Sequence, residues 1–186
     1  MKCAQRRSTS VNPAMTLPEA PTARVALDFD ALYRAARDDV FAYVATLLRD
    51  RAAAEDVTSL AFERAFRKRK SYDSRRGSER SWLFGIARNA ALDELRRRQR
   101  NAPLVSEPAD VTPAPEEELE RTLRRAALRS AQAILPARDR ELIALKFHAG
   151  LDNAELAAVL GVTVTNAGTR LHRALTKLRE ILDDQS

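Results

Sequence analysis

Residues 81–98 read SWLFGIARNAALDELRRR, and this stretch has the pattern of a long amphipathic helix. Its apolar residues recur at helical spacing in two adjacent stripes, Trp82, Ile86 and Ala90 beside Leu83 and Ala87. Three consecutive arginines end the stretch, where positive charge also suits the carboxyl end of a helix dipole. We therefore predict a helix over about residues 78–99, with an apolar side and a strongly basic end.

Two further helices are predicted before it. The first begins at Asp28 or Asp30, either of which can cap it, and its inward residues are Leu32, Ala36, Val40, Tyr43, Val44 and Leu47. The second covers about residues 53–70, with Val57, Leu60, Ala61 and Phe62 inward. Three amphipathic helices with short connections predict a compact helical domain over residues 27–100. Residues 1–26 contain Ser, Thr and three prolines without periodicity, so we predict a disordered tail.

The composition changes after residue 100. Residues 101–118 contain four prolines and five acidic side chains but no Lys or Arg, which predicts a flexible acidic Pro-rich linker. Helical periodicity resumes at 119–135, continues from Pro136 to about Gly150, and returns at 153–160 and 164–182. The predicted fold class is therefore all-α, with a second small helical domain over residues 119–183.

The bulk composition points to a polyanionic partner. The chain has 186 residues and a formal net charge of +6, which favours binding to a polyanion, either nucleic acid or an anionic membrane face. One cysteine, Cys3, and two distant histidines offer no metal site, and we predict no cofactor. Neither a secretory signal nor an apolar stretch of membrane-spanning length is present, so we expect a cytoplasmic protein without membrane insertion.

Residues 153–173 have the pattern of a helix-turn-helix. Ala157 is small where two helices would cross, and Gly161 follows in the turn. The next helix offers side chains suited to base edges and phosphates in the major groove: Thr165, Asn166, Thr169, Arg170 and Arg173. The alternative is an ordinary helical hairpin whose basic face is solvated.

A second basic region lies in the first domain. Residues 62–100 contain thirteen positive and five negative side chains, a net charge of +8. A single DNA-reading module would not need this region, so the chain is expected to contact nucleic acid at two places. Within it, Trp82 is either a core anchor or a base-stacking platform, and Asn89 either faces solvent or reads a base edge.

The order of these motifs resembles the sigma-70 family of bacterial RNA polymerase sigma factors, and in particular its extracytoplasmic-function (ECF) class. The first block resembles conserved region two through Ala54-Glu55-Asp56-Val57, Phe62, Arg76-Gly77-Ser78, residues 81–89 and residues 93–98. The second resembles region four through Leu135-Pro136, Arg140-Glu141, Glu155-Leu156-Ala157, Leu160-Gly161-Val162, residues 170–174 and Leu178-Arg179.

The resemblance implies a non-enzymatic factor that joins core RNA polymerase, recognises and melts promoter DNA, and starts transcription. The resemblance assigns contact with the β′ clamp to Asp56, Val57, Leu60 and Phe62. The loop over residues 72–82 would capture a flipped base of the minus-ten element. The resemblance assigns contact with that element to Arg76, Arg80, Trp82, Arg88, Asn89, Arg96, Arg97 and Arg98. It assigns contact with the minus-thirty-five element to Thr165, Asn166, Thr169, Arg170 and Arg173.

The resemblance also fixes the expected partners. These are core RNA polymerase, through its β′ and β subunits, and promoter DNA in double- and single-stranded form. An anti-sigma factor is a further candidate, and it would mask both domains. The linker is expected either to mimic RNA in the polymerase cleft or to act as a spacer. Thr165-Asn166-Ala167-Gly168 departs from the family pattern, so Gly168 is expected to remove one DNA contact.

Three alternatives compete with this interpretation. A helix-turn-helix regulator that acts without polymerase explains the second domain but leaves the pattern of residues 56–98 unexplained. A basic protein that binds RNA or a membrane surface explains only the charge. An enzyme is the weakest alternative, because the sequence offers no nucleophile with a base and no glycine-rich phosphate loop.

Overall fold

The structure is a computed structural model that describes residues 27–101, 127–128 and 130–184. Every regular element within these residues is helical, as the sequence predicted. The predicted tail (1–26) and almost all of the predicted linker (102–118) lie outside the described residues, as does the start of the second domain (119–126).

Aspartate caps begin the first two helices. The helix α1 (Phe29–Leu48) is capped by Asp28, whose carboxylate accepts a hydrogen bond from Ala31 N at 3.0 Å. Asp28 rather than Asp30 is therefore the cap. The chain reverses at Arg49, which has a φ of 55°, and α2 (Arg51–Lys68) starts behind the cap Asp50.

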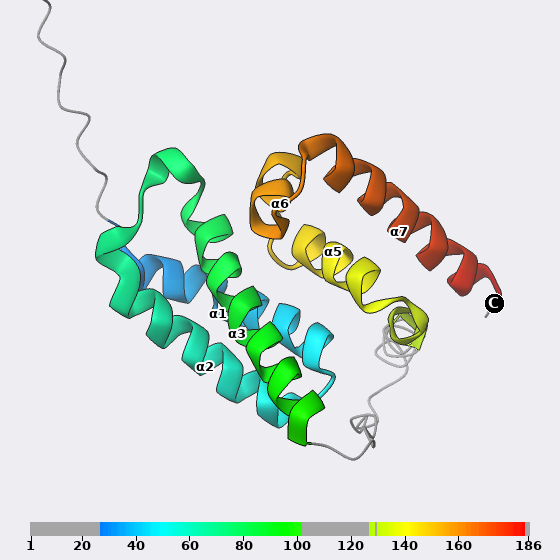
Figure 1. Cartoon of the computed structure of the whole chain (residues 1–186), viewed down its shortest axis with the longest axis horizontal. Helices are drawn as coiled ribbons and strands as arrows, with labels where there is room; N and C mark the ends of the chain where they lie inside the picture. The colour runs from blue at the N-terminus through cyan, green and yellow to red at the C-terminus, as the bar shows by residue number, and fades with distance from the viewer. Residues whose placement is uncertain (1–26, 102–126, 129, 185–186) are drawn as a thin grey trace, which may run out of the picture.

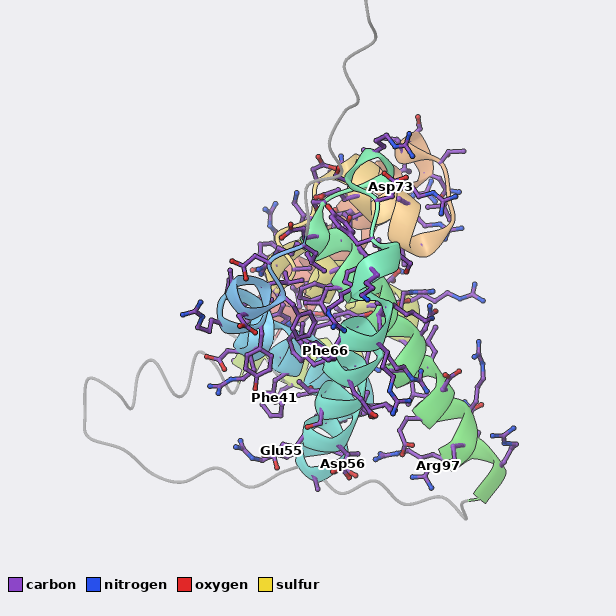
Figure 2. The ribbon with its side chains drawn as sticks, turned by 90° about the vertical axis from the view of Figure 1, so that its left-hand side faces the viewer. Phe41, Glu55, Asp56, Phe66, Asp73 and Arg97 are labelled. Atoms are coloured by element: carbon purple, nitrogen blue, oxygen red, sulfur yellow. The ribbon has the colours of Figure 1, made fainter. Side chains whose placement is uncertain are left out.

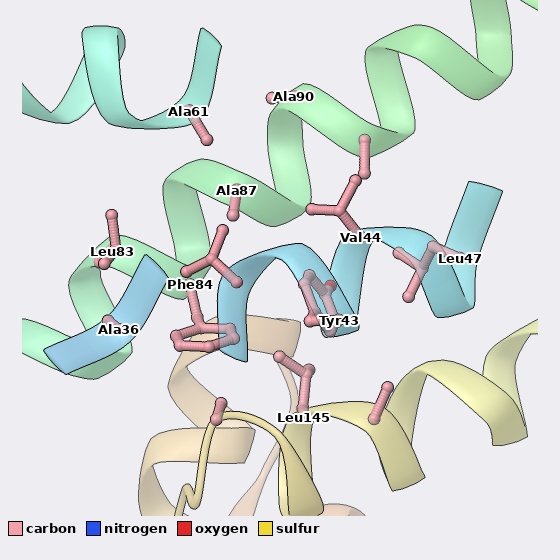
Figure 3. Packing of buried hydrophobic residues seen from close by; sticks show 14 of the residues in the cluster. Ala36, Tyr43, Val44, Leu47, Ala61, Leu83, Phe84, Ala87, Ala90 and Leu145 are labelled. Atoms are coloured by element: carbon pink, nitrogen blue, oxygen red, sulfur yellow. The ribbon is translucent and has the colours of Figure 1, made fainter. Parts of the chain in front are cut away.

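Two short 3-10 turns, η1 (Arg69–Ser71) and η2 (Ser74–Arg76), lead to α3 (Glu79–Asn101). Ser78 begins α3, because its Oγ accepts a hydrogen bond from Ser81 N at 3.1 Å. The three helices pack through small and apolar residues, and Figure 3 shows Ala61 of α2 and Val44 of α1 facing α3. This is the first predicted domain.

The second domain consists of a helical segment at residues 130–134, α5 (Ala137–Phe147), α6 (Asn153–Leu160) and α7 (Val164–Asp184). A capping box starts α6, in which Asp152 accepts from Glu155 N at 2.8 Å and the Glu155 carboxylate accepts from Asp152 N at 3.1 Å. Gly161 ends α6 with a φ of 68°, a left-handed conformation that favours glycine.

The two domains share one apolar core, although the sequence suggested two separate ones. Figure 1 shows α5 and α6 lying beside α1 and α3, and buried Leu145 lies beneath Tyr43 and Phe84 in Figure 3. Tyr43 and Phe84 are themselves fully buried, with ring centroids 5.5 Å apart. A smaller cluster holds α5 against α7 through Ala131, Leu135, Ile143, Ala174 and Leu178.

This packing corrects two expectations about individual side chains. Leu60, predicted to point inward, is 36% exposed, because α2 turns only Val57, Thr58, Ala61, Phe62 and Ala65 toward its neighbours at that level. Phe84 was not assigned to either stripe of α3 and is fully buried. The reason is that α3 is covered on two sides, by α1 and α2 and by the second domain.

Candidate nucleic-acid interface

The helix α7 exposes one face and buries the other. The five residues predicted to read DNA are all exposed: Thr165, Asn166, Thr169, Arg170 and Arg173. The opposite side packs through Ala167, Leu171, Ala174 and Leu178. Within the part of the chain that the structure describes, Arg170 and Arg173 form no ion pair, so both guanidinium groups are available to phosphates or base edges.

The turn before α7 supports the helix-turn-helix interpretation. Val162 N donates to Ala157 O at 3.0 Å across Gly161, and Thr163 Oγ1 accepts from Asn166 N at 3.3 Å. Gly168 lies on the side of α7 that faces α6, where a Cβ would be 3.4 Å from Asn153 Nδ2. The Cβ of a side chain at position 168 would therefore lie beside Asn153, and the expectation that Gly168 removes one DNA contact stays a prediction.

The loop between α2 and α3 is folded back on itself. The Tyr72 and Trp82 ring centroids are 5.5 Å apart, and Tyr72 Oη donates to Gly77 O at 3.1 Å. Partial burial raises the pKa of Tyr72, so its hydroxyl stays protonated and able to donate. Asp73 lies at the far end of the bundle in Figure 2 and accepts two hydrogen bonds from the Arg75 guanidinium, at 2.9 and 2.8 Å.

Three residues predicted to contact minus-ten DNA lie in this loop or after it on α3. Trp82 is half-buried against Tyr72, so it anchors the loop, and its contact with minus-ten DNA stays a prediction. Arg76 and Asn89 are exposed.

The three arginines at the end of α3 are paired with carboxylates. Arg96 contacts Asp93 at 3.2 Å, while Arg97 and Arg98 both donate to Glu94, at 2.7 to 2.8 Å. Those hydrogen bonds lower the pKa of Glu94 to about 2. Arg98 also donates to Asp50, the cap of α2, at 2.9 Å, so it has a structural role that the sequence did not indicate.

Arg88 and Arg80, both predicted to hold minus-ten DNA, contact the second domain. Arg88 Nε donates to Glu141 Oε1 of α5 at 2.6 Å, with 22% and 12% of the two side chains exposed. Arg80 donates to the carbonyl oxygens of His148 and Ala149, at 2.8 and 2.5 Å, and to the Asp39 carboxylate of α1. The structure thus covers two of the eight predicted minus-ten residues with the other domain.

Two of the four predicted polymerase-binding residues are exposed and two are buried. Asp56 and Leu60 are exposed on α2, whereas Val57 and Phe62 are 4% and 6% exposed. Figure 2 places Glu55 and Asp56 at the same end of the bundle as Arg97, opposite Asp73. A groove of about 540 Å³ between α1 and α2 lies beside them, lined by Tyr33, Arg37, Phe41, Arg51 and Glu55.

Two features of the described residues bear on other function classes. They contain no group of three His, Cys, Asp or Glu side chains placed to hold a metal ion. None of the described helices is long and apolar enough to cross a membrane.

Comparisons with known proteins agree with this division into two domains. The family model described as Sigma-70 region 2 matches residues 32–101, and that described as Sigma-70, region 4 matches residues 125–178.

Two curated relatives cover most of the chain. The ECF RNA polymerase sigma factor BldN of Streptomyces coelicolor is 30% identical over 176 residues, which are 92% of this chain and 67% of BldN. The ECF RNA polymerase sigma factor SigL of Mycobacterium tuberculosis is 32% identical over 163 residues, covering 83% of this chain and 90% of SigL.

Two solved structures share the fold. Sigma factor RpoE of Bartonella quintana, in complex with the anti-sigma factor NepR, superposes with a TM-score of 0.69 at 23% identity, over 84% of this chain and 97% of that one. CnrH, in complex with the cytosolic domain of CnrY, superposes with a TM-score of 0.62 at 25% identity, over 85% and 89%.

Proposed function

The chain belongs to the sigma-70 family, in its ECF class, and we propose how its residues divide the work of a factor that directs transcription initiation with RNA polymerase. The observation that carries the proposal is the order of two matched regions, each of which presents a basic helix. A regulator that acts without polymerase would account for the second region alone.

The exposed side of α2 is the proposed contact with the β′ clamp. Asp56 and Leu60 reach solvent there and can contact another protein. Val57 and Phe62 are buried, so their part in binding is to hold α2 against α1 and α3. The β subunit is proposed to contact the second domain.

The loop over residues 72–82 is the proposed site of promoter melting. Its backbone is held by the contacts of Tyr72 with Trp82 and Gly77, so the loop loses little conformational entropy when DNA binds. Unstacking a base costs a few kcal/mol, and a preformed pocket offsets that cost by stacking and by hydrogen bonds to the exposed base edge. Arg76 is part of this loop and Asn89 follows Trp82 by about two turns of α3; both are exposed and can contact the single strand.

Phosphates are the proposed ligands of the other basic residues. Arg96 and Arg97 are 66% and 61% exposed and can exchange a carboxylate partner for a phosphate. On α7, Arg170 and Arg173 supply phosphate or guanine contacts in the minus-thirty-five element, with Thr165, Asn166 and Thr169 toward the bases. We assign no catalytic residue and no cofactor, because selective binding and melting require no covalent step, and we place the protein in the cytoplasm with its polymerase.

A protein partner that restrains the factor is also proposed. CnrH, similar over 85% of this chain, was solved with the cytosolic domain of CnrY bound. By this similarity we expect an anti-sigma factor to bind this chain and cover both domains.

Run-off transcription on a pool of promoter fragments tests the function. Core polymerase with this protein should yield specific transcripts that core alone does not. If core gains nothing while the protein alone retards one DNA sequence, the regulator interpretation is correct instead.

The polymerase contact has its own test with a matched control. Asp56→Asn should weaken binding to core by about 1 kcal/mol, roughly fivefold, as for a charge in an interface. Asp30→Asn removes another exposed charge, from α1, and should leave core binding unchanged. Equal affinities for the two variants would remove Asp56 from the contact.

A further inference from the structure

The groove between α1 and α2 is lined by both aromatic and charged side chains. At one end Tyr33, which is 40% exposed, packs against Phe62 with ring centroids 4.8 Å apart. At the other end the Arg51 guanidinium lies 5.5 Å from the centroid of the Phe41 ring. Its volume of about 540 Å³ is large enough for several side chains of a bound peptide.

A buried hydroxyl in the wall of this groove forms no hydrogen bond. Thr58 is 7% exposed, and its Oγ1 has no partner among the described residues. A helical threonine often donates to the carbonyl oxygen four residues earlier, as Thr46 does to Ala42 O at 2.8 Å. Rotation about one side-chain bond, between two staggered positions that threonine adopts in helices, turns the hydroxyl. A peptide backbone in the groove would then supply the missing partner.

Charge favours a basic occupant. Residues 28–61, which include α1 and the first half of α2, contain seven acidic and four basic side chains, a net charge of −3. On the groove, Asp38 and Glu55 each pair with an arginine, but their side chains stay 88% and 57% exposed. Residues 62–100 carry a net charge of +8, so a basic segment is attracted to the groove and repelled by the rest of the first domain.

The N-terminal tail (residues 1–26) has the composition that such a groove accepts. It contains four basic residues and one acidic residue, a net charge of +3. In an extended chain, Val11, Met15 and Leu17 lie on one side and the polar Asn12 and Thr16 on the other. The three prolines of the tail restrict its backbone before binding, so it loses less conformational entropy when it docks.

The tail joins α1 next to the groove. Leu27 packs against the core, and the ring of Phe29, the first residue of α1, lies 6.4 Å from that of Phe62. Tyr33 follows about one turn later, roughly 6 Å along the helix. An extended chain spans about 3.3 Å per residue, so the tail reaches every part of the groove. Tethering also gives it an effective concentration on the order of millimolar, at which weak docking is sufficient.

We propose that the N-terminal tail binds the α1–α2 groove of the same chain and competes there with the β′ clamp of core polymerase. The apolar side chains Val11, Met15 and Leu17 face the aromatic wall, and the tail backbone bonds Thr58.

The competition follows from the position of the groove on α2. Glu55 and Ser59 line it, and each is next in sequence to an exposed residue of the proposed clamp contact, Asp56 or Leu60. A bound tail and a bound clamp therefore exclude each other. This second part rests on the proposed function, because it assigns that side of α2 to polymerase.

The docking is tested in the full-length free protein by the amide NMR signals of the groove. Replacing Val11, Met15 and Leu17 together by serine (the tail variant) should shift the signal of Ser59, although no groove residue is changed. The matched control, Asn12→Ser with Thr16→Ser, alters the other side of the same stretch and should leave Ser59 unshifted.

Thr58→Val tests the same contact from the groove. It exchanges the unpaired hydroxyl for a methyl group of similar size, so the fold should be retained, and it should shift the amide signals of residues 11–17. Groove signals that ignore the tail variant, together with tail signals that ignore Thr58→Val, would overturn the docking. Groove shifts that depend on protein concentration would show a second copy as the occupant and overturn the assignment to the tail.

Binding to core polymerase tests the competition. The tail variant should bind core about threefold more tightly than the wild type and the control, as expected if the tail occupies the groove about two-thirds of the time. Equal affinities would overturn the competition. Failure of the proposed function is distinguishable, because the wild-type protein would then start no transcription with core, whereas the NMR test of docking uses no polymerase.

Discussion

Gly77→Ala should damage promoter melting, because Gly77 has a backbone conformation that other residues rarely adopt. Its φ is 148° and its ψ is 172°, just before the cap of α3. A Cβ there would lie 2.8 Å from Ser81 Oγ. Ser81 is 7% exposed, and its hydroxyl donates to Ser78 O at 2.9 Å, so it cannot move without losing that bond.

The magnitude follows from these two effects. Backbone strain in this region costs about 1–3 kcal/mol and a lost hydrogen bond about 1 kcal/mol, so the free energy of unfolding should fall by about 2–4 kcal/mol. Relaxation of the loop would lower that cost, but it would also move Gly77 O away from Tyr72 Oη and release the ring contact with Trp82. Either route removes the preformed loop.

Urea denaturation and an open-complex assay with core polymerase measure the two consequences. Open complexes should decline while core binding, which we propose uses α2, stays normal. Gly150→Ala is the control. Its φ of 64° also disfavours alanine, at a cost of about 1–2 kcal/mol, but no atom lies within 4 Å of the added Cβ and the loop between α2 and α3 is unchanged. A Gly77→Ala protein with wild-type stability and normal open complexes would refute this reasoning.

Three further substitutions test the account of the helices. Gly168→Ala should raise the free energy of unfolding by up to about 1 kcal/mol and preserve minus-thirty-five binding in a competition assay, since the methyl group faces α6; a loss of DNA affinity would return position 168 to the DNA face. Asp50→Ala removes the cap of α2 and a partner of Arg98, and chemical denaturation should show a loss of about 1–2 kcal/mol, whereas an unchanged midpoint would exclude the cap from the stability of the fold. Because the pKa of Glu94 is lowered from 4.5 to about 2 in the folded protein, its contribution to stability is complete above pH 4.5 and is lost as pH falls toward 2. Glu94→Gln should therefore narrow the difference in unfolding free energy between pH 7 and pH 3, and an identical pH profile would contradict the assignment.

Local pattern was enough to predict the helices but not their partners. The spacing of Leu32, Ala36 and Val40 follows from chemistry within a few residues, and the structure confirms it. Of the two predicted cap candidates, Asp28 and Asp30, Asp28 is the cap. Leu60 was placed on the wrong side of α2, because it lies next to the apolar Ala61 and Phe62 and periodicity alone did not separate them. The contact of position 168 with Asn153 was also not predicted, because the two residues are fifteen positions apart in the sequence.

For the charged residues, the sequence was even less able to predict tertiary partners. A net charge of +8 over residues 62–100 suggested a free basic surface, yet Arg88 pairs with a residue 53 positions away and Arg98 with one 48 positions away. Sequence identifies which side chains can bind a phosphate, and only the tertiary packing determines which acceptor holds them in the free protein. The five residues of α7 that were predicted to contact DNA are exposed, as a DNA-binding surface requires.

The most direct test of the whole account is the distance between the domains in the free protein and in an active complex. In a Cys3→Ser background, spin labels at Ala35→Cys on α1 and Thr176→Cys on α7 occupy exposed positions in the two domains. We expect one short distance in the free protein and a clearly longer one when core polymerase and promoter DNA are bound. An unchanged short distance in a complex that transcribes would contradict the account, because Arg80 and Arg88 would still be covered while the promoter is open.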